Sequence, residues 1–237
     1  MNSTMSKASV TQVLGLSGGI MQVKIQLALG SNFSFREGQY VDMVLADGKC
    51  RTFSIASSPE SEKELTFHLR DVEDGLLEEL LLQHLNEGVE VELDGPKGDF
   101  RLGLFDSKPL LMLAGGTGFA PIHSMMEYAM AHNISRQVTL YWGVRSRDEL
   151  YCDETIKAWA RECGWFNYVP VLSHDDWQGR TGLVHEALLA DYESLVGHEV
   201  YVSGAPQMVK AAYDTFLARG LAENDFYSDI LEYAKTV

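Results

Sequence analysis

The hydrophobic pattern of the chain changes near residue 105, and this change constrains the fold more than any other feature. Before it, segments such as 21–27 and 64–69 alternate apolar and polar residues, and glycine or proline turn signals separate them. After it, apolar runs alternate with helical segments, which is typical of a parallel sheet covered by helices on both faces. The chain is therefore predicted to form two domains: an N-terminal antiparallel β-barrel over residues 1–104 and a C-terminal α/β parallel-sheet domain over residues 105–237.

Individual elements follow from the same pattern. In the second half, strands are predicted at 109–114, 138–143, 168–172 and 199–203, and helices at 120–132, 154–163, 181–189 and 207–219. In the first half, one helix is expected from residue 75 or 76 to about residue 85. No repeat or long linker separates the halves, so we expect them to pack tightly.

Charge and cysteine content argue against several classes of function. The 237 residues include 19 Lys and Arg against 34 Asp and Glu, a formal net charge of -15, so the protein's field repels nucleic acid and acidic membranes. Cys50, Cys152 and Cys163 form no CxxC pair, so we expect no metal or iron–sulfur site. No apolar stretch approaches the roughly 20 residues that span a bilayer, and the first residues lack an apolar signal core. We expect a cytoplasmic protein without nucleic-acid or membrane partners.

A glycine-rich run, Gly115-Gly116-Thr117-Gly118, follows the first predicted strand of the second half. Glycines permit a tight turn and the close approach of a diphosphate, and the N–H groups and dipole of the following helix favour its charge. Thr117 adds a hydroxyl donor. Pro121 stands where the last glycine of GxGxxG would be, so the standard dinucleotide fingerprint is absent. From this run alone, a nucleotide site and a plain strand-to-helix turn remain equally open.

Two further strand ends in this half carry candidate ligand-binding residues. Arg145 follows strand 138–143, where an NAD-specific unit places an acid. An arginine there tolerates a ribose phosphate and favours NADPH as well as NADH, although a merely solvated arginine explains it equally well. Ser203 and Gly204, followed by Pro206 and Met208, repeat the strand-to-helix turn. All three strand ends are expected at the carboxyl edge, where open parallel sheets bind ligands.

In the first half, Arg51-Thr52-Phe53-Ser54 occupies a predicted strand. Arg51 and Ser54 lie on opposite faces of such a strand, yet both can touch one elongated ligand, Arg51 at a phosphate or ribityl group and Ser54 at a polar ring edge. A β-hairpin with a surface arginine is the competing interpretation, and the tetrapeptide alone favours it. His68 and Arg70 share a face of the next predicted strand, although a lone strand histidine is more often structural.

The order of the motifs is more specific than any one of them. Along the chain stand RTFS, HLR, DGPKGDF, LAGGTGFAP, YWGVRSRDELY, VSGAPQM and YSD. In this order the chain resembles the ferredoxin–NADP reductase superfamily, and it is most similar to the bacterial NAD(P)H:flavin oxidoreductases, the general flavin reductases and luminescence-operon flavin reductases. The resemblance covers essentially the whole chain.

The resemblance implies a flavin-binding barrel and an NAD(P)H-binding domain whose ligands meet at the domain junction. It implies that Ser54 is the catalytic residue, close to the flavin nitrogen N5 that accepts hydride. The implied flavin-binding residues are Arg51, Thr52, Phe53, Ser54, His68, Leu69 and Arg70. The implied NAD(P)H-binding residues are Gly115, Gly116, Thr117, Gly118, Pro121, Arg145, Ser203, Gly204, Pro206 and Met208.

The sequence departs from the family pattern at two informative positions. Relatives that hold FAD tightly have Gly-x-x-Ser or Gly-x-x-Thr after the second flavin strand, but here Glu78 follows Gly75. A carboxylate at that point repels a diphosphate, so we expect the flavin to bind loosely, as a substrate. Ser203 replaces the cysteine of many relatives, which weakens a catalytic role for that residue.

The function implied by the resemblance is an NAD(P)H-dependent flavin reductase. It transfers hydride from NADH or NADPH to FMN, riboflavin or FAD and releases the reduced flavin, which a flavin-dependent monooxygenase or a luciferase then receives. One alternative is a flavoprotein that retains FAD and passes electrons to a protein partner such as an oxygenase component. The other is a non-catalytic nucleotide-binding module.

Overall fold

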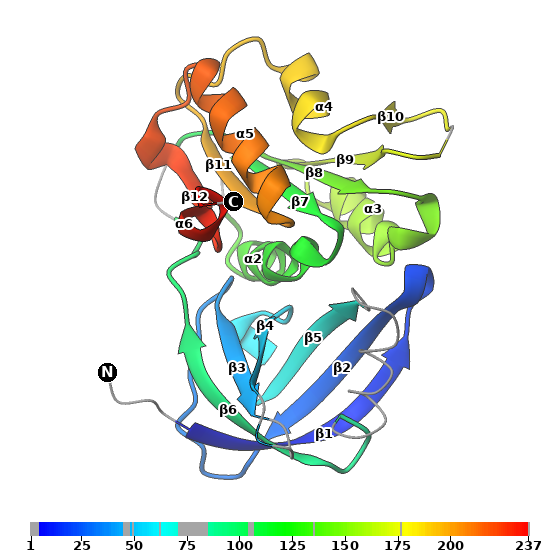
Figure 1. The fold of residues 1–237 in the computed structure, drawn as a ribbon, viewed down its shortest axis with the longest axis vertical. Coiled ribbons are helices and arrows are strands. Elements are labelled where there is room, and N and C mark those ends of the chain that lie inside the picture. Colours follow the sequence, from blue (N-terminus) through cyan, green and yellow to red (C-terminus); the bar gives the residue numbers. More distant parts are fainter. Residues whose placement is uncertain are drawn as a thin grey trace.

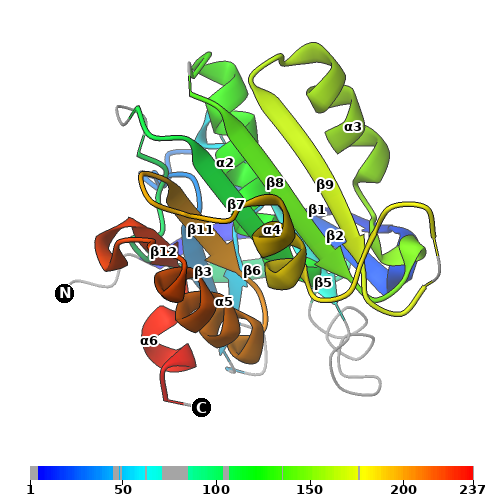
Figure 2. The same ribbon diagram turned by 90° about the horizontal axis from the view of Figure 1, so that it is seen from above.

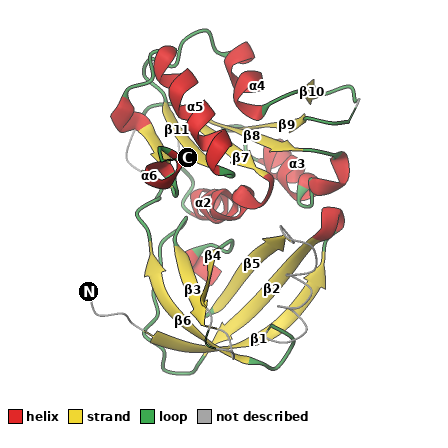
Figure 3. Ribbon diagram, viewed as in Figure 1, coloured by secondary structure: helices red, strands yellow, loops and turns green. Residues whose placement is uncertain are grey.

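The computed structural model describes residues 5–44, 48, 50–61, 63–70, 85–103, 107–134, 136–175 and 177–236. Two six-stranded sheets follow each other along the chain, and Figure 1 shows the second above the first. The α-helices of the described residues all belong to the second half. Figure 3 colours helices red, and the red segments in the barrel are short 3-10 turns. This arrangement confirms the predicted fold class. None of the helices in these ranges is both long and apolar enough to cross a membrane.

The first sheet is antiparallel and has the strand order β4-β3-β6-β1-β2-β5. Alternate residues of its strands point inward, as Val23 and Ile25 do in β2, so the period-two pattern forms a closed apolar core. The sheet curls until its two edge strands meet beyond β4, where the Ala56 N–H donates to the Thr66 carbonyl at 2.8 Å. Its strands are β1 (Met5–Gly15), β2 (Ile20–Leu27), β3 (Tyr40–Val44), β4 (Cys50–Ser54), β5 (Glu64–Arg70) and β6 (Glu90–Lys97).

The second sheet is parallel and has the strand order β10-β9-β8-β7-β11-β12. Its strands are β7 (Leu110–Gly115), β8 (Val138–Val144), β9 (Phe166–Leu172), β10 (Arg180–Thr181), β11 (Glu199–Ser203) and β12 (Phe226–Ser228). The helices are α2 (Phe119–Ala131), α3 (Asp153–Glu162), α4 (Val184–Asp191), α5 (Pro206–Ala218) and α6 (Leu231–Ala234).

Strand β7 shows why the strands of this half are almost continuously apolar. Leu110 and Met112 belong to the apolar cluster that contains residues of α2 and α3, whereas Leu111 and Leu113 pack with residues of α4 and α5. Both faces of the strand are therefore buried. Figures 1 and 2 show α4 and α5 on the outer face of the sheet and α2 between the sheet and the barrel.

The element boundaries differ from the sequence predictions in a few places. The helix expected at 181–189 begins at Val184, because Thr181 pairs with β9 as part of β10 and Gly182 has a left-handed φ of +97°. Gly95 and Pro96, expected in a turn, belong to β6. The expected helix at about 75–85 falls almost entirely outside the described residues, as does Glu78.

Helix α2 fixes how the two domains face each other. The His123 Nδ1 lies 2.8 Å from the carbonyl oxygen of Ala56, and the Ser124 hydroxyl donates to the carbonyl of Ser57 at 2.7 Å. These bonds attach one side of α2 to the barrel, while its other side packs beneath the parallel sheet. The start of α2, which follows the glycine run, is thereby held above the barrel.

Candidate active site

A cleft of about 1140 Å³ lies between the two domains. This exceeds the ~300–1,000 Å³ of a typical site for one small molecule, so the cleft has room for two ligands. Of the predicted site residues, Pro121 alone is not among those that line the cleft; it is buried in the first turn of α2. The structure thus brings Arg51 to Ser54, His68 to Arg70, Gly115 to Gly118, Arg145, and the predicted residues between Ser203 and Met208 around one space.

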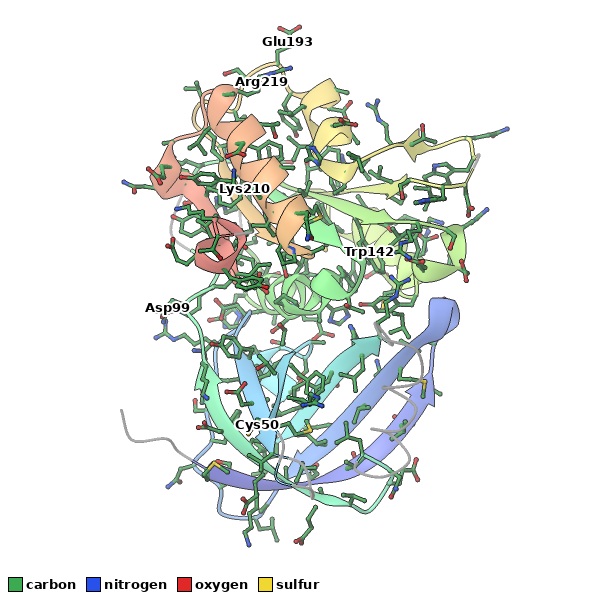
Figure 4. The ribbon with its side chains drawn as sticks, in the orientation of Figure 1. Cys50, Asp99, Trp142, Glu193, Lys210 and Arg219 are labelled. Carbon is green, nitrogen blue, oxygen red and sulfur yellow. The ribbon has the colours of Figure 1, made fainter. Side chains whose placement is uncertain are left out.

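The glycine run, Gly115 to Gly118, lines the cleft on the side of the α/β domain. Gly116 has a φ of +54° and opens the short turn η3 (Gly116–Gly118) that leads into α2. The Trp142 indole N–H donates to the Gly116 carbonyl at 3.0 Å, and the Trp142 ring stacks on Phe119 with centroids 4.2 Å apart. Figure 4 labels Trp142 near the domain boundary. Buried aromatic packing therefore holds the turn in place from behind.

A second glycine turn meets the first at close range. A Cβ on Gly118 would lie 2.4 Å from the carbonyl oxygen of Ser203, and one on Gly204 would lie 3.1 Å from the backbone of Gly115. Gly204 also has a φ of +154°. Only residues without a side chain permit these two strand ends to touch, so β7 and β11 form one continuous wall.

Beside this wall, Ser203 pairs with an acid that the sequence did not single out. The Ser203 hydroxyl donates to Oδ2 of Asp229 at 3.0 Å, and both residues line the cleft. Burial raises the pKa of Asp229 to about 6, partly offset by the hydrogen bond from Ser203. Asp229 follows β12, a three-residue strand that is too short to show periodicity. The YSD motif that contains Asp229 was the available signal.

The barrel wall offers side chains rather than backbone. Ser54 lines the cleft, and its hydroxyl has no hydrogen-bond partner among the described residues. Arg51 also lines it, and its Nη1 donates to the Cys50 carbonyl at 3.1 Å. The Thr52 hydroxyl donates to Asp42. Lys97 pairs with the same carboxylate at 2.6 Å and, together with Thr52, holds the pKa of Asp42 below its usual range.

His68 bonds across the domain boundary. The Tyr151 hydroxyl lies 3.2 Å from Nδ1 of His68. Burial, assisted by His123, lowers the pKa of His68 to about 3, and burial raises that of Tyr151 well above its ordinary value. Both groups are therefore neutral near pH 7, and the tautomer of His68 decides which of them donates. A neutral, buried His68 bonded to Tyr151 agrees with a structural role for this strand histidine. A contact between His68 and flavin stays a prediction.

Several lining residues were not predicted from the sequence. Glu149 lines the cleft and pairs with Arg70 across the boundary. Ser173 and residues 182–185 extend the cleft past Arg145, which is exposed. Ser173 follows β9, a predicted strand, so the carboxyl-edge rule alone points to it. Residues 182–185 follow β10, and the same rule points to them only once that short strand is recognised.

Both kinds of implied ligand fit the residues present. A Cβ on Gly116 would meet only Arg70 Nη1, 3.6 Å away, so the glycine turn is open toward the cleft, where the N-terminus of α2 offers N–H groups to a diphosphate. The hydroxyl of Ser54 and the guanidinium of Arg51 suit the polar ring edge and the phosphate or ribityl chain of a flavin. In the described ranges, no three His, Cys, Asp or Glu side chains gather to hold a metal ion.

Comparison with known proteins matches each half of the chain to a family of oxidoreductase domains. Residues 7–102 match the family "Oxidoreductase FAD-binding domain", and residues 112–214 match the "Oxidoreductase NAD-binding domain". The Vibrio harveyi NAD(P)H-flavin reductase is 33% identical over 81% of this chain and 84% of its own length. The CDP-6-deoxy-L-threo-D-glycero-4-hexulose-3-dehydrase reductase of Yersinia pestis is 37% identical over 87% of this chain.

The lengths of these relatives differ. This chain spans 63% of the Yersinia reductase. The solved Amycolatopsis cytochrome P450 reductase GcoB has a TM-score of 0.88 and is 31% identical, over 95% of this chain and 69% of that one. The chain belongs to the ferredoxin–NADP reductase superfamily, with one FAD-binding and one NAD-binding oxidoreductase domain. Among its relatives are proteins named NAD(P)H-flavin reductases.

Proposed function

We propose that the protein is an NAD(P)H:flavin oxidoreductase that reduces a diffusible flavin. One observation carries the proposal: one cleft is lined both by Ser54 of the barrel and by the Gly115–Gly118 turn of the parallel sheet. A flavin along β4 and a pyridine nucleotide along the glycine turns then share one space. Reduced nicotinamide supplies a hydride and flavin accepts it, so the redox chemistry belongs to the ligands.

The chain's own task is alignment. Helix α2 fixes the two walls of the cleft relative to each other, so the nicotinamide and the flavin are held in contact. The reaction between them then needs no bimolecular encounter in solution. Ser54 offers a hydrogen bond at the polar edge of the flavin ring. The Ser203 hydroxyl and the Asp229 carboxyl lie on the opposite wall. There we expect them to border the nicotinamide end of the nucleotide.

The proposal treats flavin as a substrate because of the sequence at residues 75–78. Glu78 stands where tight FAD binders carry a hydroxyl, and a carboxylate repels a diphosphate. The reduced flavin would leave to serve a flavin-dependent monooxygenase or a luciferase. The relatives of 33% identity that are named flavin reductases support this interpretation.

A retained flavin is the second candidate, favoured by the likeness to GcoB and to the Yersinia reductase. In that case, the protein would keep FAD and pass electrons to a protein partner such as an oxygenase component. Desalting separates the two candidates. If the purified protein keeps stoichiometric flavin through desalting, the diffusible-flavin proposal fails.

The decisive activity test is oxidation of NADH and NADPH with added riboflavin, FMN and FAD. We expect turnover with at least one flavin and a rate that saturates with flavin concentration. Absence of oxidation with every flavin would favour the non-catalytic nucleotide-binding module.

A further inference from the structure

Among the methionines that the structure describes, Met208 alone lines the cleft. It lies in the first turn of α5, where its backbone N–H donates to the Ala205 carbonyl at 2.9 Å. Its side chain is partly exposed and packs at the edge of the apolar cluster that contains residues of α4 and α5. The thioether therefore has apolar surroundings on one side and is within reach of small solutes on the other. Four other methionines are buried: Met43, Met112, Met125 and Met126.

The thioether of Met208 packs against both glycine turns of the backbone wall. A Cβ on Gly115 would lie 2.5 Å from Sδ of Met208, and a Cβ on Gly204 would lie 2.7 Å from its Cε. The same Cβ on Gly204 would lie 3.1 Å from the backbone nitrogen of Gly115. Sulfur and methyl group thus lie where the ends of β7 and β11 touch. An unbranched apolar side chain fits this narrow space, and an added atom on the sulfur does not.

Oxidation of the sulfur would change the size and the polarity of this contact, because methionine sulfoxide is polar and chiral. If the new oxygen points at the glycine turns, it needs space that Gly115 and Gly204 occupy, and the two strand ends must separate. If it points into the cleft, it places a hydrogen-bond acceptor beside the expected diphosphate. There it repels phosphate oxygens and competes for the N–H groups of the turn. Both orientations weaken the nucleotide site.

The proposed reaction is itself a source of oxidant. A reduced flavin that meets dioxygen transfers two electrons and two protons to it, which gives oxidised flavin and hydrogen peroxide. When peroxide attacks the thioether, a lone pair of the sulfur forms an S–O bond, the O–O bond breaks, and the second oxygen leaves as water. The sulfur loses two electrons and the peroxide gains them, so no further reactant is needed.

We propose that Met208 is a modification site at which oxidation by peroxide to the sulfoxide weakens binding of the pyridine nucleotide. The inference rests on the proposed function, because it takes the nucleotide diphosphate at the Gly115–Gly118 turn and the peroxide from reduced flavin. It adds a feedback to that function: when reduced flavin reaches dioxygen instead of its acceptor, oxidised Met208 slows further consumption of NAD(P)H. The modification is reversible, because methionine sulfoxide reductases reduce both sulfoxide epimers.

The test compares the ADP-ribose affinity of each variant before and after treatment with hydrogen peroxide, with calorimetry as the measurement. ADP-ribose has the diphosphate but no nicotinamide, so its binding does not depend on hydride transfer or on flavin. Dithiothreitol after the treatment reverses disulfides and sulfenic acids of the cysteines. Peptide mapping by mass spectrometry gives the sulfoxide fraction at each methionine. The variants are Met208→Leu and, as the matched control, Met130→Leu, since Met130 is also partly exposed but lies outside the cleft.

We expect the treated parent protein to bind ADP-ribose about tenfold more weakly, in proportion to the sulfoxide fraction at Met208. Methionine sulfoxide reductases should restore the affinity. Met208→Leu keeps a similar volume but has no sulfur, so peroxide should leave its affinity at its own starting value. Met130→Leu should lose affinity as the parent does. Met208→Gln places a polar amide at the glycine turns and should bind weakly without any oxidant.

Three results would overturn the proposal. The first is an equal loss of affinity in the treated parent and in treated Met208→Leu, which would assign the loss to another residue. The second is parental affinity in protein whose Met208 is mapped as the sulfoxide. The third is a Met208 that stays reduced while Met5, which is 47% exposed, is oxidised. If Met208→Leu melts early, Met208→Ile replaces it with the same expected result.

The outcome is distinguishable from failure of the proposed function. A protein that oxidises no NAD(P)H with any flavin, yet loses ADP-ribose affinity when Met208 is oxidised, would keep this modification site and lose the flavin reductase. Normal flavin reduction with no effect of Met208 oxidation on ADP-ribose affinity would do the reverse. If the untreated protein bound no ADP-ribose, the nucleotide site and the role of Met208 would fail together.

Discussion

The two walls of the cleft are built from different material. The parallel-sheet wall is mostly backbone: Gly118 and Gly204 bring two strand ends into contact, and no side chain fits between them. The barrel wall is formed by residues of strand β4, where both Arg51 and Ser54 line the cleft. A backbone wall tolerates little change in shape, because its contacts leave no room for a Cβ. A side-chain wall tolerates changes in shape but depends on particular chemical groups.

The largest expected effect is on the backbone wall. Gly118→Ala places a methyl group 2.4 Å from the Ser203 carbonyl oxygen, and that neighbour is backbone rather than a flexible side chain. The strand ends must separate, so we expect ADP-ribose affinity to fall more than about 100-fold and the melting temperature to drop by roughly 5–10 °C. Calorimetry and thermal denaturation measure the two effects.

Gly164→Ala is the matched control, because nothing lies within 4 Å of a Cβ there. It should leave both quantities close to the parent. If Gly118→Ala bound ADP-ribose as tightly as the parent, the ends of β7 and β11 would be able to separate without loss of the site. The contrast between the two walls would then be wrong.

On the side-chain wall, Ser54→Ala should change chemistry and leave shape intact. Removing the hydroxyl creates no clash, but it deletes the hydrogen bond proposed at the flavin ring edge. We expect kcat to fall roughly 10- to 100-fold with the KM for NADH almost unchanged, the pattern of an interaction realised in the transition state. Ser54→Thr keeps a hydroxyl and should recover most of the rate. An unchanged kcat in Ser54→Ala would remove Ser54 from the mechanism.

Asp229 is the place where the backbone wall carries a titratable group. Burial raises its pKa from 3.8 to about 6, so the folded protein keeps a proton that the unfolded chain releases. Ionisation therefore destabilises the fold, with no effect below about pH 4 and the full effect above about pH 6. Two pKa units correspond to roughly 3 kcal/mol; because the residue is partly exposed, we expect about 1–2 kcal/mol.

Asp229→Asn should thus be more stable than the parent at pH 8 and equal to it at pH 4 in denaturant titrations. Turnover should fall about three- to tenfold, because the amide still accepts from Ser203 but carries no charge. Any inflection near pH 6 in the kcat profile should disappear with it. A stability gain that is the same at both pH values would contradict the raised pKa.

The contrast between the walls also explains what the sequence could predict. Residues 110–115 and 138–144 are apolar on both faces, so the sequence predicts their strands. Glycine in a strand-to-helix turn indicates a site built from backbone N–H groups. The strands Arg180–Thr181 and Phe226–Ser228 are too short for any period. Asp229 and Glu149 acquire their neighbours only through tertiary packing. A bond such as that between Arg70 and Glu149, 79 residues apart, leaves no local pattern.

The smallest expected effect concerns the exposed end of the nucleotide site. Arg145 lines the cleft beside the end of β8, and it is exposed, so water screens any contact that it makes with a ribose phosphate. We expect Arg145→Gln to raise the KM for NADPH by about threefold and to leave the KM for NADH unchanged. Arg147→Gln removes an equal charge two residues away, where the side chain does not line the cleft, and should alter neither value. If Arg145→Gln raised both KM values equally, the arginine would act on the diphosphate shared by the two nucleotides, and the backbone wall would depend on side-chain charge more than its geometry suggests.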